Sequence, residues 1–214
     1  NGADTVFHLA AMARVQPSIE EPVPFHNVNV TGTHNLLVAA RDMKVKRFVF
    51  SSSSSVYGNA SVPTPEEHKM NPISPYALHK LIGEQYCKLF SDLYDIDTLS
   101  LRYFNVYGNR MNLEGAYRLA IPIFAKQILE GNANILAANS TSNLKGDVFN
   151  IGNGSNYSVN ELADMLGGEK SYGNKVTEPF ETLADNSKAA LILDWEPKGN
   201  LSEWIQSYKK DLGI

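Results

Sequence analysis

Short apolar, β-rich segments that alternate with amphipathic helices constrain the fold of this chain more than any other feature. Residues 4–11, 46–50 and 98–103 have the composition of buried strands. Between them, residues 25–43 and 76–94 repeat apolar side chains at helical spacing. Such alternation favours a parallel sheet covered on both faces, with ligands at the carboxyl ends of the strands. The sequence therefore predicts an α/β fold with a doubly wound parallel sheet.

The second half of the chain has a different pattern of expected elements. After Gly108, polar loops separate four expected helices and one strand; the helices are 121–130, 159–166, 187–193 and 201–212, and the strand is 148–151. This pattern predicts a first domain over residues 1–108 and a smaller, mainly substrate-binding α/β domain over residues 109–214. We leave open that the strand at 148–151 returns to the first sheet.

Composition and charge exclude several classes of function. The basic residues of this 214-residue chain are scattered and its net charge is -4, so no surface for nucleic acid or an anionic membrane is expected. The single cysteine, Cys87, cannot form an internal disulfide. No apolar run approaches the roughly eighteen residues of a membrane span. We expect a cytoplasmic protein that binds neither nucleic acid nor membrane.

A serine run and a tyrosine–lysine pair mark the candidate reaction centre. Residues 51–55 are serines at the end of a predicted strand, and Tyr76 and Lys80 begin the next predicted helix. Positions i and i+4 share one helical face, so the phenol and the ammonium lie side by side. The ammonium favours the phenolate and lowers the tyrosine pKa from its usual value of about 10. Tyr76 can then act as a base while a serine hydroxyl holds the same substrate oxygen.

Each of these features alone has a purely structural interpretation. A tyrosine and a lysine at this spacing are most often a solvated pair, and a serine run after a strand is most often a loop. Here the strand, the serine run, a proline-rich loop and the Tyr-x-x-x-Lys helix follow one another between two buried strands. The conjunction favours a reaction centre over packing.

Seven stretches in a fixed order carry a family resemblance. They are HLAA (8–11), NVTGT (29–33), FSSSSSVYG (50–58), SPYALHK (74–80), LRYFNVYG (101–108), VFNIGNG (148–154) and LADNSKA (183–189). By these stretches the chain resembles the extended short-chain dehydrogenases/reductases of the NAD-dependent epimerase/dehydratase family, and most of all their UDP-glucose and UDP-N-acetylglucosamine 4-epimerases. The resemblance implies a Rossmann-like sheet, a UDP-sugar substrate and tightly held NAD.

The resemblance also implies roles for single residues. Ser53, Tyr76 and Lys80 would form the reaction centre, in which Ser53 and Tyr76 bind the 4-oxygen of the sugar and Lys80 bonds the nicotinamide ribose. Asn29 would brace the cofactor and Asn105 would hold a substrate phosphate. Residues that would approach the cofactor are Leu9, Ala10, Ala11, Ser51 and Phe104. The implied reaction moves hydride from C4 to NAD and returns it to the opposite face of a rotated 4-keto sugar.

Two serines favour one branch of this family. The sugar-nucleotide 4,6-dehydratases and the decarboxylating relatives carry a carboxylate beside the reaction-centre serine, whereas this chain has Ser54 and Ser55 there. A hydroxyl cannot replace a carboxylate as acid or base, so 4-epimerisation is favoured. The alternatives are a dehydratase or reductase of nucleotide sugars on the same scaffold, and a non-catalytic nucleotide-binding member.

Fewer residues indicate the substrate and the assembly. Thr182 matches a family position at which a bulky aromatic side chain excludes N-acetylated sugars, so we expect UDP-glucose, UDP-galactose and their N-acetylated forms; a Thr182 that only packs is equally open. Lys175 falls where relatives often carry a pyrophosphate-binding arginine, and it would supply charge without a bidentate fork. The resemblance implies a homodimer through the helices that begin at Phe25 and Tyr76.

Two features of the family do not occur in the sequence. The turn G-x-x-G-x-x-G, which brings a dinucleotide pyrophosphate to a helix N-terminus, is missing, and this predicts two β-α units before Asn1. Near residues 131–135, the chain runs directly into an expected helix where relatives place a strand, a Gly-rich loop and a substrate-phosphate arginine. We expect that segments have been closed up in the numbering.

Overall fold

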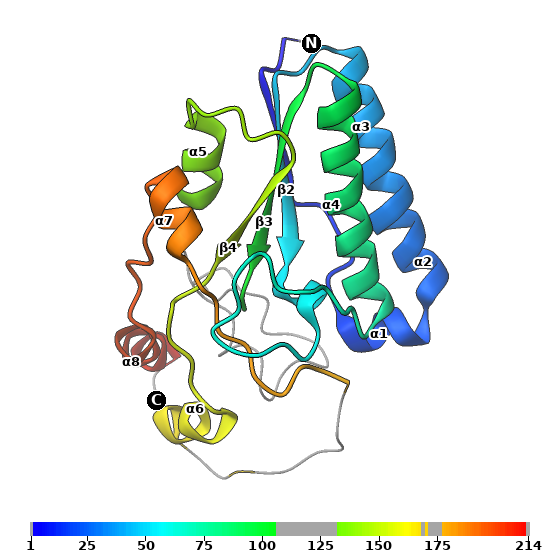
Figure 1. The fold of residues 1–214 in the computed structure, drawn as a ribbon. Coiled ribbons are helices and arrows are strands. Elements are labelled where there is room, and N and C mark those ends of the chain that lie inside the picture. The colour runs from blue at the N-terminus through cyan, green and yellow to red at the C-terminus, as the bar shows by residue number, and fades with distance from the viewer. Residues whose placement is uncertain (1, 106–131, 168–169, 171–176, 213–214) are drawn as a thin grey trace.

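The computed structural model describes residues 2–105, 132–167, 170 and 177–212 (Figure 1). Within them, the centre is a parallel sheet in the order β1 (Thr5–His8), β2 (Arg47–Ser53), β3 (Asp97–Tyr103) and β4 (Asp147–Ile151). All three strand pairs are parallel, so the carboxyl ends meet at one edge of the sheet. The predicted α/β fold with a parallel sheet is confirmed.

Helices cover both faces of this sheet. Figure 1 shows α3 (Gly32–Asp42) and α4 (Pro75–Leu93) on one face, and α5 (Asn132–Asn139) and α7 (Ser187–Leu193) on the other. The single helix expected from Phe25 is composite, because α2 (Pro22–His26) continues through a π turn (Asn27–Thr31) into α3. A further short helix, α1 (Val15–Glu20), precedes it.

Strand β2 shows why both faces need a cover. Phe48 and Phe50 contribute to a buried cluster with Leu37 and Cys87 on the α3–α4 side. The residue between them, Val49, contributes to a second cluster on the α5–α7 side. Successive side chains of a strand point to opposite faces, so a continuous apolar run buries both.

The remaining elements form a third cluster away from the sheet. Helices α6 (Val159–Leu166) and α8 (Leu201–Leu212) pack through Leu162, Leu201 and Ile205. A reciprocal cap, in which Ser158 and Glu161 bind each other's backbone N–H, begins α6. Thus β4, α5 and α7 belong to the sheet and its covers, whereas α6 and α8 pair with each other. The division at residue 108 stays a prediction, since 106–131 lie outside the described residues, as does the expected helix at 121–130.

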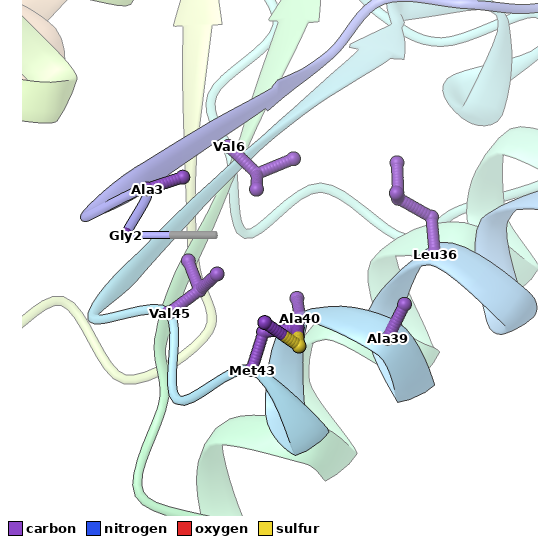
Figure 2. A pocket seen from close by; sticks show the side chains of 8 residues that line it. All are labelled: Gly2, Ala3, Val6, Leu36, Ala39, Ala40, Met43 and Val45. Atoms are coloured by element: carbon purple, nitrogen blue, oxygen red, sulfur yellow. The ribbon is translucent and has the colours of Figure 1, made fainter.

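An apolar hollow of about 190 Å³ lies near the start of β1 (Figure 2). Val6, Leu36, Met43 and Val45 are among its lining residues. These residues belong to the amino-terminal end of the sheet and the adjoining part of α3. The hollow therefore lies away from the strand ends that carry the candidate reaction centre.

A buried ion pair joins α4 to β3. Arg102 donates two hydrogen bonds to the Glu84 carboxylate, Nε to Oε1 at 2.9 Å and Nη2 to Oε2 at 2.8 Å. The two side chains are only 1% and 5% exposed, in that order. Ser52 adds a hydroxyl donor to the same carboxylate. Because these charges are almost fully buried, each depends on the other for its stabilisation.

We predict that Glu84→Gln lowers the free energy of unfolding by about 3–5 kcal/mol, because it leaves a buried arginine without its anion. Urea unfolding followed by circular dichroism measures this change. Asp92→Asn is the matched control: it breaks the Lys88–Asp92 pair of the same helix, whose side chains are about half exposed, and should cost less than about 1 kcal/mol. Equal losses in the two variants would contradict the prediction.

Candidate active site

The start of α4 places Tyr76 at the carboxyl edge of the sheet. The Ser74 hydroxyl accepts the Ala77 N–H at 3.2 Å, and Pro75 follows this cap at the first helical position. The buried Ser18 of α1 then accepts the backbone N–H of Tyr76 at 3.1 Å. A cap, a proline and a contact from another helix therefore fix where the tyrosine begins its turn.

Lys80 lies one turn further along α4 and is buried. Its Nζ donates to the carbonyl oxygen of Ser51 at 2.7 Å, and it lies 5.9 Å from the Tyr76 ring centroid. Burial lowers the pKa of Lys80 from 10.5 to about 8, against the opposing charge of Glu84. The ammonium thus stays mainly protonated at neutral pH. An ammonium has three N–H donors, so the bond to Ser51 leaves capacity for ligand hydroxyls.

Ser53 ends the strand that carries Ser51. Its hydroxyl oxygen accepts the Ser55 N–H at 3.2 Å and so caps the 3-10 turn of Ser54–Tyr57. Because the oxygen is the acceptor here, the hydroxyl proton can still be donated to a ligand. The structure therefore brings Ser51, Tyr76 and Lys80 together and places Ser53 at the end of the same strand.

The side chain of Asn29 binds the backbone of the segment that follows β1. The Asn29 side chain is 3% exposed, and its amide binds Met12 twice: Oδ1 accepts Met12 N–H at 2.8 Å and Nδ2 donates to Met12 O at 2.9 Å. Leu9 and Ala10 are exposed and Ala11 is half-buried. Asn29 thus braces the backbone that follows the predicted cofactor segment, and any effect on a cofactor passes through that backbone.

His8 contributes a further polar link beneath this segment. Thr33 donates its hydroxyl proton to Asn29 O at 2.7 Å, so at the 2.8 Å contact with His8 Nε2 the histidine is the donor. Burial, assisted by the Lys80 charge, lowers the pKa of His8 to about 4. The ring is therefore neutral at physiological pH, with its proton on Nε2.

The ends of β3 and β4 converge beside Phe104. Its N–H donates to Ile151 O at 2.9 Å, and its ring centroid lies 6.1 Å from that of Tyr57. At Gly152 a Cβ would come within 2.7 Å of Ala184 Cβ and 3.0 Å of Phe104 Cβ, so only glycine permits this approach. Asn105 follows with a positive φ of 27° and an exposed side chain.

Thr182 lies at the same edge, next to a two-stranded bridge. Thr64 N–H donates to Leu183 O at 2.8 Å and Asp185 N–H donates to Thr64 O at 3.1 Å. These bonds fasten the segment around half-buried Thr182 to the proline-rich loop. Lys175 lies outside the described residues, so its predicted role is not placed.

Several contributors carried little sequence signal. Ser18 had none, because its contribution is a hydrogen bond to Tyr76, a residue 58 positions away in the chain. Tyr57 and Asn150 lay within two of the recognised stretches, yet nothing local separated them from ordinary strand-end residues. In the described part of the chain, no group of three or more His, Cys, Asp or Glu side chains could hold a metal ion. No helix in the same residues is long and apolar enough to cross a membrane.

Comparison with known proteins decides the family. Residues 1–152 match the NAD dependent epimerase/dehydratase family. The chain belongs to this family. A putative UDP-glucose 4-epimerase of Methanocaldococcus jannaschii is 34% identical to it, over 95% of this chain and 75% of the relative. The resemblance, the Rossmann-like fold and the NAD dependence of the family are thereby confirmed.

Solved structures agree with this placement. The UDP-N-acetylglucosamine 4-epimerase of Methanobrevibacter ruminantium M1, in complex with UDP-N-acetylmuramic acid, superposes with a TM-score of 0.82 at 31% identity, over 97% of this chain and 77% of that one. MoeE5 in complex with UDP-glucuronic acid and NAD gives a TM-score of 0.85 at 29% identity, over 99% and 80%. These two structures hold different UDP-sugars on one fold.

The buried Lys80 generates a pH prediction. Its pKa is about 8 in the folded protein and 10.5 as the ordinary value, so the unfolded chain binds more protons between these pH values and stability rises with pH across that window. Below pH 8 the burial cost is fully present. Relative to Lys80→Met, the unfolding free energy of the wild type should rise by roughly 3 kcal/mol from pH 7.5 to 10.5. Urea unfolding measures it, and parallel pH profiles for the two proteins would contradict it.

Proposed function

We propose that this protein is an NAD-dependent UDP-sugar 4-epimerase that interconverts UDP-glucose and UDP-galactose and also accepts their N-acetylated forms. The observation that carries the proposal is the buried Lys80 ammonium, held at Ser51 O one turn after Tyr76. A lysine, a tyrosine and a strand-end serine gathered at the carboxyl edge of a parallel sheet suit proton transfer at a sugar hydroxyl.

The reaction assigns one task to each of these residues. Tyr76 accepts the proton of the 4-hydroxyl and later returns it. Ser53 donates its hydroxyl proton to the same oxygen in a hydrogen bond. Lys80 favours the phenolate form of Tyr76, which is the form that can accept a proton, because its ammonium stays charged near neutral pH. NAD, when bound, supplies the hydride acceptor and donor for C4.

The residues present fit that cofactor. Lys80 has donors left for the ribose hydroxyls, and the exposed Leu9 and Ala10 leave the backbone after β1 open to a planar ring. Phe104, half-buried at the end of β3, offers an aromatic wall beside the same edge. We assign Ala11 and Ser51 to this cofactor surface, and Asn105 to a substrate phosphate.

The neighbours of Ser53 support epimerisation over elimination or decarboxylation. Ser54 and Ser55 occupy the turn where those branches carry a carboxylate. Two buried carboxylates of the surrounding structure are engaged elsewhere, Glu84 with Arg102 and Glu66 with the backbone N–H of Asn150. Tyr76 and Ser53 are therefore left as the acid–base pair, which suffices for a reaction that breaks no C–O or C–C bond.

We also propose a homodimer built on α4 and its helical neighbour. Four apolar side chains there are 42–61% exposed: Leu78, Leu89 and Leu93 of α4 and Val28 of the π turn. Apolar side chains on a helix face that the sheet does not cover suit a partner.

Sedimentation analysis should show a dimer that Leu89→Asp dissociates, and a monomeric wild type would refute the proposal. A cytoplasmic location stays a prediction.

We expect Tyr76→Phe to abolish 4-epimerisation, because the phenyl ring keeps the shape but cannot take a proton. The assay separates the 4-epimers formed from UDP-glucose and UDP-N-acetylglucosamine with NAD, and turnover should fall by at least about a hundredfold. Tyr86→Phe, which removes a hydroxyl from the same helix, should retain activity. Conversion that survives Tyr76→Phe would exclude this residue as the base. A wild type that binds NAD without converting either sugar would favour another branch, and one that binds no NAD would favour a non-catalytic member.

Thr182→Tyr should separate the two sugar classes. If Thr182 leaves room for an N-acetyl group, a bulky ring there should lower kcat/KM for UDP-N-acetylglucosamine by at least about tenfold and leave UDP-glucose within about threefold. Thr182→Ser, which keeps a small side chain, is the matched control and should accept both. Equal effects on both sugars would mean that Thr182 only packs.

A further inference from the structure

One buried amide ties together two segments that are distant in sequence. Asn150 is fully buried, and its Nδ2 donates to Thr64 O at 2.9 Å and to Asp185 O at 3.3 Å. Its Oδ1 accepts the hydroxyl proton of Tyr57 at 2.8 Å. Both donors and the acceptor of the amide are therefore used, and no other standard side chain of this size offers two donors and an acceptor in one plane.

The two tied segments are those that frame Thr182. The amide lies behind the bridge in which Thr64 pairs with Leu183 and Asp185. Thr182 directly precedes Leu183, whose carbonyl accepts the Thr64 N–H. A change in the distance between Thr64 O and Asp185 O would therefore move Thr182.

The same amide is connected to the catalytic helix. Arg102 Nη1 donates to the Tyr57 hydroxyl at 2.7 Å, and Arg102 also holds Glu84, one turn beyond Lys80 on α4. Burial raises the pKa of Tyr57 to about 12, so its phenol keeps the proton that it donates to Asn150. An unbroken series of buried hydrogen bonds thus runs from α4 to the segment of Thr182.

We propose that Asn150 is a positioning residue that sets sugar selectivity, by holding Thr182 at a fixed distance from the helix that carries Tyr76. The inference rests on the proposed function, in which Thr182 borders the N-acetyl group of the sugar. Because Asn150 is fully buried, we expect it to act on the width of the pocket and not on the proton transfer. Loss of the amide removes one of the two donors to Thr64 O, which keeps the Asp185 N–H, and removes the Asn150 donor to Asp185 O, so the two segments are held less firmly.

The test compares the binding of UDP-glucose and UDP-N-acetylglucosamine to the NAD-loaded protein by calorimetry, together with kcat. Asn150→Ala should change the ratio of the two dissociation constants by about tenfold, because a shift of Thr182 alters the room for the N-acetyl group and leaves the rest of the sugar site in place. Tyr57→Phe removes only the hydroxyl that orients the amide, and should change the ratio in the same direction by about threefold. In both variants kcat for UDP-glucose should stay within about threefold and NAD content should not change.

Thr98→Val is the matched control. It removes another fully buried hydrogen bond, from the Thr98 hydroxyl to Cys87 O at 2.7 Å, near the start of β3 and away from the reaction centre. It should lower the thermal midpoint without changing the ratio. A ratio unchanged in Asn150→Ala and Tyr57→Phe, with midpoints lowered as in the control, would overturn the inference. Sugars that bind with an altered ratio but are not converted by the wild type would refute the proposed function alone, and sugars that do not bind at all would refute both.

Discussion

The close approach of α4 to β2 is the contact on which the rest of this site depends. At Gly83 a Cβ would lie 2.4 Å from a carbon of the Phe50 ring, so any side chain there would push the helix away from the strand. One turn earlier on the same helix, Lys80 reaches the carbonyl of Ser51 only because the helix lies this close. The absence of a side chain at Gly83 therefore allows the buried Lys80 ammonium to reach its acceptor, Ser51 O. Burying a charge without one is costly, so packing and chemistry are coupled at this point.

The polar interior gives the site two supports of different kind. On the side proposed for the cofactor, Asn29 binds the Met12 backbone and His8 donates to the Thr33 hydroxyl, and the low pKa of His8 keeps its ring neutral beside the Lys80 ammonium. On the side proposed for the sugar, the Glu84–Arg102 pair continues through Tyr57 to Asn150. Residues that never touch a ligand can in this way set the geometry of those that do.

The fold was largely predictable because each apolar segment carries its own period. The expected strands and the helix at residues 76–94 agree with β1 to β4 and α4 to within three residues. The serine run was the less obvious part, since Ser51 to Ser53 extend β2 by pairing with Leu101 to Tyr103. No periodicity could reveal the cross-connections. Arg102 and Asn150 look like ordinary polar strand residues, Tyr57 lies in the turn after β2, and their partners lie 18 to 93 residues away. Asn29 was predicted to brace the cofactor, and the structure places its amide on the Met12 backbone.

The fate of the hydrogen at C4 tests the central claim most directly. A 4-epimerase built on Tyr76, Ser53 and Lys80 moves the hydroxyl proton through a side chain but keeps the C4 hydrogen inside the site until it returns to the sugar. UDP-glucose labelled with deuterium at C4 is incubated with the NAD-loaded protein in ordinary water, and the epimers are separated and analysed by mass spectrometry. The account predicts a 4-epimer that retains its deuterium. A 4-epimer that has exchanged it for solvent hydrogen, or a labelled product altered at another carbon, would contradict the account.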